Sequence, residues 1–369
     1  MAVTKPFRAA VVGLGRAGHI HTAVLRSLDD VTLVAVADPD PVRRAAFDSV
    51  HTAASAEDLL ELELDYCVVA TPITEREQVG LALAAAGIPA LIEGPIAPSL
   101  PAAMRLAEAF DNAGLLGAVI QIERYNPAVT ELGVRLRGGD FGSVYQVTTR
   151  RYDRFHDPSP PMGVVTETAT HDVDLAMWLT GSHVTSVAAN VARVSGCGDE
   201  DHAVALLRLS GGEIAEIQVN RISPYKERVV IAHTDRVYVV ADALTHTITH
   251  YAHDGLGDAA RATNPTPHLA GKVTSYEVPD ADPFRRLHEA FRDALLGLPS
   301  NIATLRQGAA GIAATEAILA AARTGTCVTP TDHILPTANL RAAQTPAPVI
   351  ARDSPSRDDH AGNHHAAPI

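Results

Sequence analysis

Residues 11–18 read VVGLGRAG and place three glycines, Gly13, Gly15 and Gly18, between an apolar strand and a helix. The first glycine allows a tight turn, the second lets the backbone approach a pyrophosphate, and the third lets helix and strand pack closely. The free N–H groups at the start of the helix favour phosphate binding. We therefore predict a dinucleotide-binding turn, with further cofactor contacts from the residues between the glycines, Leu14, Arg16 and Ala17.

Asp38 ends the next strand-like run, twenty residues after Gly18. A carboxylate at this place accepts hydrogen bonds from the ribose 2′-hydroxyl and would repel a 2′-phosphate. The sequence therefore favours NAD as the cofactor. Arg43 and Arg44 follow on an expected helix and leave NADP as the alternative.

Strand-like and helix-like segments alternate around this turn as far as about residue 120. Continuous apolar strands separated by helices indicate a parallel sheet covered on both faces. We expect an α/β protein whose residues 1–122 form an N-terminal Rossmann domain, a doubly wound parallel sheet. The strands are expected at 8–15, 31–40, 64–72, 88–95 and 115–127, and the helices at 17–28, 41–50, 75–87 and 99–114.

The pattern changes after residue 123. Successive strand-like runs alternate apolar and polar residues, which is typical of a mostly antiparallel sheet with one solvated face. A helix is expected at 166–181, ended by Gly181, and a long helix of small residues at 304–325 is suited to packing back on the first domain. We predict a C-terminal α/β domain with a large open sheet over residues 123–335 and a disordered tail over residues 336–369.

Composition limits the class of protein. The formal net charge of −13 argues against nucleic-acid binding and against binding to an anionic membrane surface. No apolar segment is long enough to cross a membrane, and no signal peptide is recognised. The three cysteines match neither a disulfide nor a zinc pattern, so we expect reduced thiols in a cytoplasmic protein.

The helix expected at 166–181 carries Glu167, His171 and Asp174 at positions i, i+4 and i+7, on one helical face. A histidine held by a carboxylate one turn away can take a hydroxyl proton while hydride leaves for nicotinamide. The alternatives are a structural histidine, or a metal ligand acting with Asp172 or Asp174. Nicotinamide chemistry needs no metal, so we expect no metal site.

Five segments together resemble the glucose–fructose oxidoreductase/inositol dehydrogenase (Gfo/Idh/MocA) family, near its UDP-sugar 3-dehydrogenase branch. They are the glycine turn, ATP at 70–72, LIEGPIAPS at 91–99, ERYNPAV at 123–129 and TATHDVDLAMWLTG at 168–181. The resemblance runs from about residue 7 to about residue 330. It implies NAD(P)-linked chemistry on sugars or cyclitols, and a C-terminal sheet that forms a homodimer or homotetramer.

The resemblance also implies roles for individual residues. His171 becomes the general base, oriented or charge-balanced by Glu167, and Asp174 supports the substrate. Thr71 and Pro72 lie along the middle of the cofactor. The remaining assignments are cofactor contacts from Arg76, Glu93 and Gly94, and substrate contacts from Arg124, Tyr125, Asn126 and Tyr152.

The chain departs from the family pattern at three of these positions. Gly94 stands where the family has a lysine that touches the reacting hydroxyl, Arg76 replaces a histidine, and Glu167 replaces an aspartate. Losing an ammonium that stabilises a developing alkoxide costs roughly 3–4 kcal/mol by analogy with one lost oxyanion donor. A histidine base can still accept the proton, so Gly94 predicts a slower or differently organised enzyme.

We therefore expect an NAD-dependent dehydrogenase that oxidises a secondary ring hydroxyl of a hexose unit, at C3 by the branch resemblance, ahead of transamination by an aminotransferase in amino-sugar or antibiotic biosynthesis. A nucleotide sugar needs cations for its diphosphate, and an aminoglycoside needs carboxylates. Candidate cations are Arg124, Arg150, Arg151, Arg154 and Arg221, and candidate carboxylates are Glu123, Asp153, Asp157, Glu167 and Asp174. The alternatives are a cyclitol dehydrogenase, a catalytically weakened NAD- and sugar-binding protein, and an enzyme that retains NAD without net NADH release.

Overall fold

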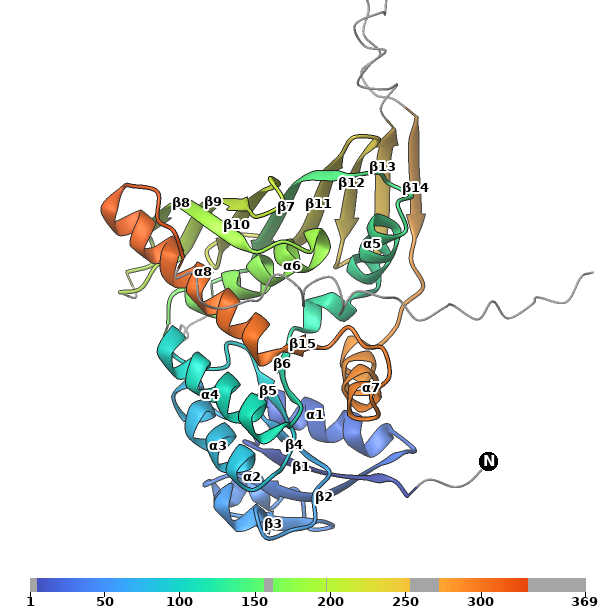
Figure 1. The fold of residues 1–369 in the computed structure, drawn as a ribbon, viewed down its shortest axis with the longest axis vertical. Coiled ribbons are helices and arrows are strands. Elements are labelled where there is room, and N and C mark those ends of the chain that lie inside the picture. The colour runs from blue at the N-terminus through green and yellow to red at the C-terminus, as the bar shows by residue number, and fades with distance from the viewer. Residues whose placement is uncertain (1–4, 156–161, 197, 253–271, 331–369) are drawn as a thin grey trace, which may run out of the picture.

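The structure is a computed structural model that describes residues 5–155, 162–196, 198–252 and 272–330. Within these ranges the chain forms two sheets with helices between and around them (Figure 1). The predicted tail, Cys197 and Asp157 lie outside the described residues. The predicted division at residues 122 and 123 stays a prediction.

The first sheet contains the dinucleotide-binding turn. Its order across the sheet is β15-β6-β5-β4-β1-β2-β3, and all neighbouring strands are parallel except the pair of β15 and β6. The order of the first six strands is that of a Rossmann fold. These strands are β1 (Phe7–Val12), β2 (Val31–Ala37), β3 (His51–Ala53), β4 (Tyr66–Val69), β5 (Ala90–Glu93), β6 (Gly117–Ile120) and β15 (Ala303–Thr304).

Helices cover both faces of this sheet, as the apolar strands predict. Alternate strand residues divide between two cores: Val11 and Val68 pack toward α1 and α7, and Val12 and Val69 pack toward α3 and α4. The helices are α1 (Arg16–Ser27), α2 (Pro41–Arg44), α3 (Ile73–Ala85), α4 (Leu100–Ala113) and α7 (Pro283–Leu295), with a short 3₁₀ turn η1 (Glu57–Leu59).

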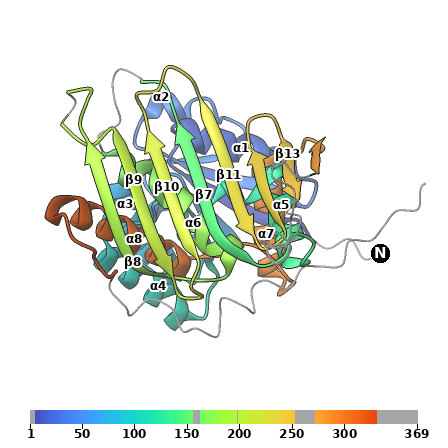
Figure 2. The same cartoon turned by 90° about the horizontal axis from the view of Figure 1, so that it is seen from above.

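The second sheet is the large, open, mostly antiparallel sheet that was predicted. Its order is β14-β13-β12-β11-β7-β10-β9-β8, and β7 and β10 are parallel. Helices lie against one face, and Figure 2 shows the other face of the described part without a covering element. The strands are β7 (Val144–Tyr152), β8 (Val184–Ala192), β9 (His202–Leu209), β10 (Ile214–Asn220), β11 (Glu227–Thr234), β12 (Val237–Asp242), β13 (Thr247–Ala252) and β14 (Val273–Glu277).

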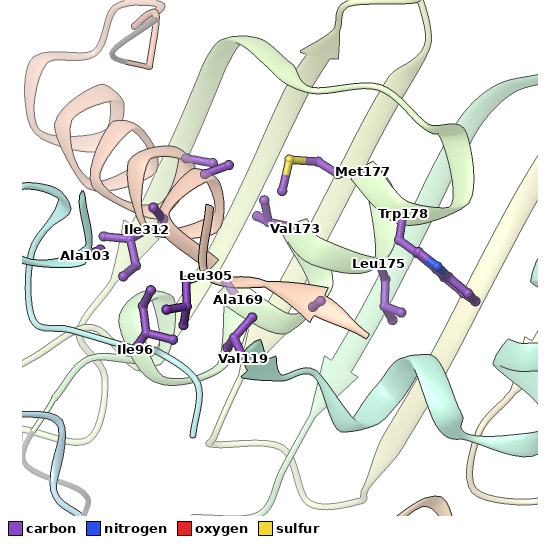
Figure 3. Packing of buried hydrophobic residues seen from close by; sticks show 14 of the residues in the cluster. Ile96, Ala103, Val119, Ala169, Val173, Leu175, Met177, Trp178, Leu305 and Ile312 are labelled. Atoms are coloured by element: carbon purple, nitrogen blue, oxygen red, sulfur yellow. The ribbon is translucent and has the colours of Figure 1, made fainter. Parts of the chain in front are cut away.

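The helices between the sheets join the two halves into one core. Ile96 and Val119 of the first half pack with Leu305 and Ile312 of α8, and with Ala169 and Val173 of the second half (Figure 3). The long helix α8 therefore packs back on the first domain, as predicted. The elements of this layer are η2 (Ile122–Tyr125), α5 (Pro127–Arg137), η3 (Val165–Ala169), α6 (Thr170–Thr180) and α8 (Leu305–Thr324).

Two sequence expectations about elements were wrong. The helix expected at 41–50 is only the turn α2, because i→i+3 bonds such as Phe47 N–H to the Arg44 carbonyl tighten its end and Phe47 turns into the core. The helix expected at 166–181 begins as a π-helical turn, η3, before it becomes α6. Gly181 ends that helix in the left-handed region with φ of 70°, as predicted.

Candidate active site

At each position of the dinucleotide turn, glycine is favoured for a different steric reason. A Cβ added at Gly13, where φ is +91°, would lie 2.6 Å from the Ala70 carbonyl, and one added at Gly18 would lie 1.8 Å from the Gly13 oxygen. A Cβ added at Gly15 meets nothing within 4 Å, and no side chain caps the helix there. The turn therefore packs tightly at two glycines and leaves open space at the third, the arrangement that a pyrophosphate requires.

Asp38 lies at the end of β2 beside this turn. Its carboxylate accepts hydrogen bonds from the backbone N–H of Leu14 (2.7 Å) and of Asp40 (2.9 Å), and Arg43 approaches it at 3.4 Å. Burial raises the pKa of Asp38, but these N–H groups and Arg43 outweigh burial and lower it. Asp38 is thus a carboxylate directly after β2, where the contact with the ribose was predicted.

A cavity of about 270 Å³ opens next to Asp38. It has the position and mixed polarity that the adenosine half of a dinucleotide needs. Thr71 and Pro72, from the turn after β4, line the same cavity, as expected for residues along the cofactor. Other lining residues are Gly13, Arg43, Ser55 and Glu75.

His171, at the start of α6, is half-buried near the carboxyl ends of β5 and β6. Its Nδ1 lies 2.7 Å from Oε1 of Gln121, the first residue after β6. Because an amide oxygen only accepts, Nδ1 carries the hydrogen and Nε2 keeps its lone pair. Burial, and then the charge of Arg151, lower the pKa of His171. The histidine is therefore a neutral base with a defined tautomer.

Gly94 faces this histidine. A Cβ added at Gly94 would lie 3.5 Å from Cε1 of His171 and 3.1 Å from the carbonyl oxygen of Ile120. The Gly94–Pro95 peptide bond is cis. A longer side chain at position 94 would start beside the base in a tight place, where the Ile120 carbonyl would have to shift by a few tenths of an ångström.

Arg76 fastens the turn that contains Gly94. Its Nε donates to the carbonyl of Thr71 (2.9 Å), and its Nη1 donates to the carbonyls of Glu93 (3.1 Å) and Pro95 (2.6 Å). Burial lowers the pKa of Arg76, and the neighbouring Glu93 opposes that effect. The bonds on both sides of Gly94 give Arg76 a structural part in the site; its predicted contact with the cofactor stays a prediction.

An ion network lies beside His171. Arg151, on β7, donates from Nε to Asp172 (2.6 Å) and from Nη1 to Glu123 (2.5 Å). Burial raises the pKa of Glu123, but Arg151 outweighs that effect and keeps it low. The two carboxylates neutralise the buried guanidinium and fix its position next to the base.

The expected partnership of His171 and Glu167 was wrong. Glu167 instead lies 3.4 Å from Nη1 of Arg221, and the partner of His171 is Gln121. Glu167 lies within the π-helical turn η3, and the cation that follows β10, Arg221, pairs with its carboxylate. Burial raises the pKa of Glu167, which remains 38% exposed.

Two residues expected to bind substrate form a buried pair instead. Arg124 donates to both carboxylate oxygens of Asp174, at 2.7 and 2.6 Å, and both side chains are almost fully buried. An internal bidentate pair satisfies these charges and leaves neither free for a sugar. The prediction that Asp174 supports the substrate is therefore corrected, and so is the substrate role of Arg124.

Three further substrate candidates lie elsewhere. Tyr125 is buried, and the amide of Asn126 caps α5 and donates to the Ala243 carbonyl at 2.9 Å. Tyr152 bonds to Gln218 at 2.6 Å on the open face of the second sheet, because neighbouring strand residues face opposite ways and Arg151 faces inward. The structure thus assigns structural positions to these three residues.

The sequence analysis missed the residue that orients the base. Gln121 is the first polar residue after an apolar strand, at the sheet edge where α/β proteins bind ligands, and that position was the available signal. Among the described residues, no group of histidine, cysteine, aspartate or glutamate could hold a metal ion. None of the helices described is both long and apolar enough to cross a membrane.

The dinucleotide turn and the neutral histidine base both lie at the carboxyl edge of a Rossmann sheet, the arrangement of a nicotinamide-dependent oxidoreductase of CH–OH groups. Residues 7–120 match the profile described as "Oxidoreductase family, NAD-binding Rossmann fold", and residues 131–242 match "GFO/IDH/MocA C-terminal domain". The chain belongs to the Gfo/Idh/MocA oxidoreductase family, as its motifs predicted. It is an NAD-dependent dehydrogenase of sugars or cyclitols.

Several relatives have known names. The chain is 28% identical over 253 residues to UDP-N-acetylglucosamine 3-dehydrogenase of Acidithiobacillus ferrooxidans, covering 68% of this chain and 78% of that protein. It is 26% identical over 235 residues to scyllo-inositol 2-dehydrogenase (NAD(+)) of Bacillus subtilis, covering 59% and 68%.

Solved structures share the fold. The Acidithiobacillus ferrooxidans UDP-N-acetylglucosamine 3-dehydrogenase GnnA superposes with a TM-score of 0.75 at 22% identity, covering 87% of this chain and 99% of that one. GenD2 from gentamicin A biosynthesis, in complex with NAD, superposes with a TM-score of 0.73 at 23% identity, covering 89% and 97%.

Proposed function

We propose that the protein oxidises a secondary ring hydroxyl of a hexose unit to a ketone, with NAD as hydride acceptor and His171 as general base. The observation that carries the proposal is the bond from His171 Nδ1 to Gln121, which leaves Nε2 free to accept a proton. When bound, the nicotinamide supplies a two-electron acceptor. Nε2 of His171 takes the hydroxyl proton while the carbonyl forms.

The base works without a neighbouring ammonium. Gly94 offers no side-chain donor to the developing alkoxide, and Arg151, the cation whose charge acts on His171, is neutralised by Glu123 and Asp172. The alkoxide must therefore be stabilised mainly by His171 itself and by the nicotinamide charge. We expect a slow enzyme unless the substrate brings its own cation.

Charge favours an amine-bearing substrate over a nucleotide diphosphate. Of the five arginines considered for a diphosphate, Arg124, Arg151 and Arg221 are buried in ion pairs. Arg150 pairs with Glu227, and Arg154 donates to the Pro224 carbonyl. Glu93 and Glu167 keep 15% and 38% of their side chains exposed, and Glu93 lies close enough to His171 for the two charges to interact, so a substrate amine placed at the base would meet a carboxylate.

The ring position and the biological setting are also proposals. Oxidation at C3 is supported by the similarity to the UDP-N-acetylglucosamine 3-dehydrogenase, and an aminoglycoside setting by the likeness to GenD2. A ketone on a sugar ring is the substrate form that an aminotransferase accepts. We therefore place transamination after this step.

The test is to incubate the protein with NAD and three substrate classes, UDP-hexoses, free inositols and aminoglycosides, and to follow NADH at 340 nm. A rise with the aminoglycosides alone would support the amine proposal. A rise with a UDP-hexose alone would contradict it and keep the dehydrogenase. No rise with any class, with NAD bound, would favour the catalytically weakened binding protein.

The open face of the second sheet is the proposed contact between copies of the chain. Leu206 on β9 is exposed, and Tyr152 of β7 and Tyr238 of β12 lie on the same face. Light scattering after size-exclusion chromatography checks this proposal. Leu206→Glu should reduce a dimer or tetramer to a smaller species, and a native protein that is monomeric would contradict the proposal.

A further inference from the structure

A buried chain of three polar side chains runs behind the end of β5. Nε2 of His288, on α7, lies 2.9 Å from Nδ1 of His21, on α1. Nε2 of His21 lies 3.1 Å from Oε1 of Glu93. His21 is 0% and His288 1% exposed, whereas the Glu93 side chain keeps 15%. The chain thus leads from the protein interior to a partly open carboxylate beside Gly94.

The donors and acceptors in this chain can be counted. Burial raises the pKa of Glu93, but the hydrogen bond from His21 and the charge of Arg76 outweigh burial and lower it. Glu93 is then a carboxylate and accepts a hydrogen from Nε2 of His21. With its one hydrogen donated to Glu93, the His21 ring presents a bare Nδ1, which accepts from Nε2–H of His288.

The surroundings of His288, at the buried end of this hydrogen-bonded series, agree with this assignment. Nδ1 of His288 is buried and has no hydrogen-bond partner among the described residues. A bare nitrogen tolerates that place better than an N–H group, because orphaned buried donors are rare. Burial also lowers the pKa of His288 well below its ordinary value, so that the ring is neutral.

Packing alone does not account for an imidazole at position 288. An apolar side chain of similar size would fill the same space without leaving a buried nitrogen unpartnered. The ring of His21 is also held in place, with Phe284 of α7 edge-on at 5.4 Å and 77°. Two residues of α7 therefore fix the orientation of one ring on α1.

We propose that His288 is a positioning residue: its Nε2–H holds the His21 ring in place and so holds Glu93 as an oriented carboxylate beside the reacting centre. The inference rests on the proposed function for the identity of that centre. A carboxylate fixed there favours the positively charged oxidised nicotinamide over the neutral reduced ring. His288 thereby shifts the affinity of the site toward NAD and away from NADH.

The test compares native protein with His288→Leu, His288→Met and His288→Gln, because the glutamine can still donate to His21. Phe291→Leu is the packing control, since Phe291 is buried on the same helix against the Tyr66 ring at 5.2 Å and lies outside the chain. The first readout is the ¹⁵N signals of the histidine rings in the protein alone. The second is the ratio of the Kd values for NAD and NADH.

We expect His21 to carry its hydrogen on Nε2 in native protein, in His288→Gln and in Phe291→Leu. The apolar variants should keep that hydrogen on Nε2, because the Glu93 carboxylate still accepts it, but should shift the ¹⁵N signal of Nδ1 of His21, which loses its donor. They should also weaken NAD relative to NADH about tenfold, by analogy with loss of other groups that orient a ligand-binding residue. The proposal is overturned if native His21 carries its hydrogen on Nδ1, or if Phe291→Leu changes both readouts as much as the apolar variants do. Neither readout needs a sugar, so failure of the proposed function would be seen separately.

Discussion

The cofactor side and the reacting side of the site are built differently. On the cofactor side, one contiguous turn from Gly13 to Gly18 presents backbone, and its shape depends on glycines within it. On the reacting side, His171 depends on Gln121, and the adjacent Arg151 depends on carboxylates from two other elements. A binding site formed by backbone groups depends on a few glycines in one turn. A site formed by side chains depends on residues from several elements that are far apart in sequence.

The largest expected effect separates the two sides. His171→Ala should lower kcat by about 10²–10⁴-fold, the usual worth of a general base, and leave the Kd for NAD unchanged. Steady-state kinetics with the substrate found in the panel, and titration with NAD, check both statements. His51→Ala, an exposed histidine of the first domain, is the control. A variant of undiminished rate would exclude His171 as the base.

An effect of comparable free energy, but on stability, is expected at the buried Arg124–Asp174 pair of the reacting side. Asp174→Ala leaves the Arg124 guanidinium uncompensated in the interior and should lower the free energy of unfolding by about 3–5 kcal/mol. KM of the protein that still folds should stay near the native value. Denaturant unfolding and kinetics below the transition measure these quantities. A rise in KM without loss of stability would restore the substrate role of Asp174.

The glycine turn supplies a matched pair of variants. Gly18→Ala places its Cβ against the Gly13 carbonyl and should cost about 1–3 kcal/mol of stability, as overpacking does, with loss of NAD binding. Gly15→Ala meets no atom, so it should unfold like native protein yet bind NAD more weakly. Thermal unfolding and NAD titration distinguish them. Equal destabilisation by both variants would contradict the steric assignment.

A smaller effect is expected from the residue that orients the base. Gln121→Leu removes the acceptor of Nδ1–H and frees the His171 ring to change tautomer, so kcat should fall about tenfold with little change in NAD affinity. Kinetics at saturating NAD give the result. If kcat is unchanged, another group holds the tautomer and the side-chain network is less interdependent than we describe.

The smallest effect is a shift in pH dependence. His171 acts unprotonated and burial lowers its pKa, so kcat/KM should fall as pH decreases, with a midpoint below about 6.5. Gln121→Glu would place a negatively charged carboxylate next to Nδ1–H of His171. That charge should raise the pKa of His171 and move the midpoint to higher pH. A pH–rate profile of both proteins checks the sign. A shift to lower pH would contradict the contact between residues 121 and 171.

The sequence predicted the local structure of the cofactor side, since Gly13, Gly15 and Gly18 form one turn and Asp38 follows the adjacent strand. The contacts of these residues with NAD remain predictions. It predicted the identity of His171 but gave the wrong partner. The spacing placed Glu167 on the face of His171, but it revealed neither the π-helical turn at Val165–Ala169 nor Arg221, the cation that pairs with Glu167. Local spacing cannot reveal such a turn.

Long-range pairing accounts for the other differences. Arg124 lies fifty positions before Asp174, and their burial as a pair depends on how α6 packs against η2. Tyr152 and Arg151 are neighbours in sequence yet face opposite sides of the sheet, and only the register of β7 decides which one faces inward. One avoidable omission was α5, because Asn126 followed by Pro127 is a recognisable helix start.

Because α7 and β15 come late in the sequence but pack on the first sheet, the first domain cannot be complete until they have been synthesised. When residue 122 has left the ribosome, the dinucleotide turn and six of the seven strands of the first sheet exist, but α7 and β15 do not. Until residues 283–304 are made, Tyr66 lacks Phe291 and His21 lacks its partner His288. A nascent chain that stalls before that point has the phosphate-binding turn, His21 and Glu93 but lacks His288 and the rest of α7, so the first domain is completed last although its synthesis begins first.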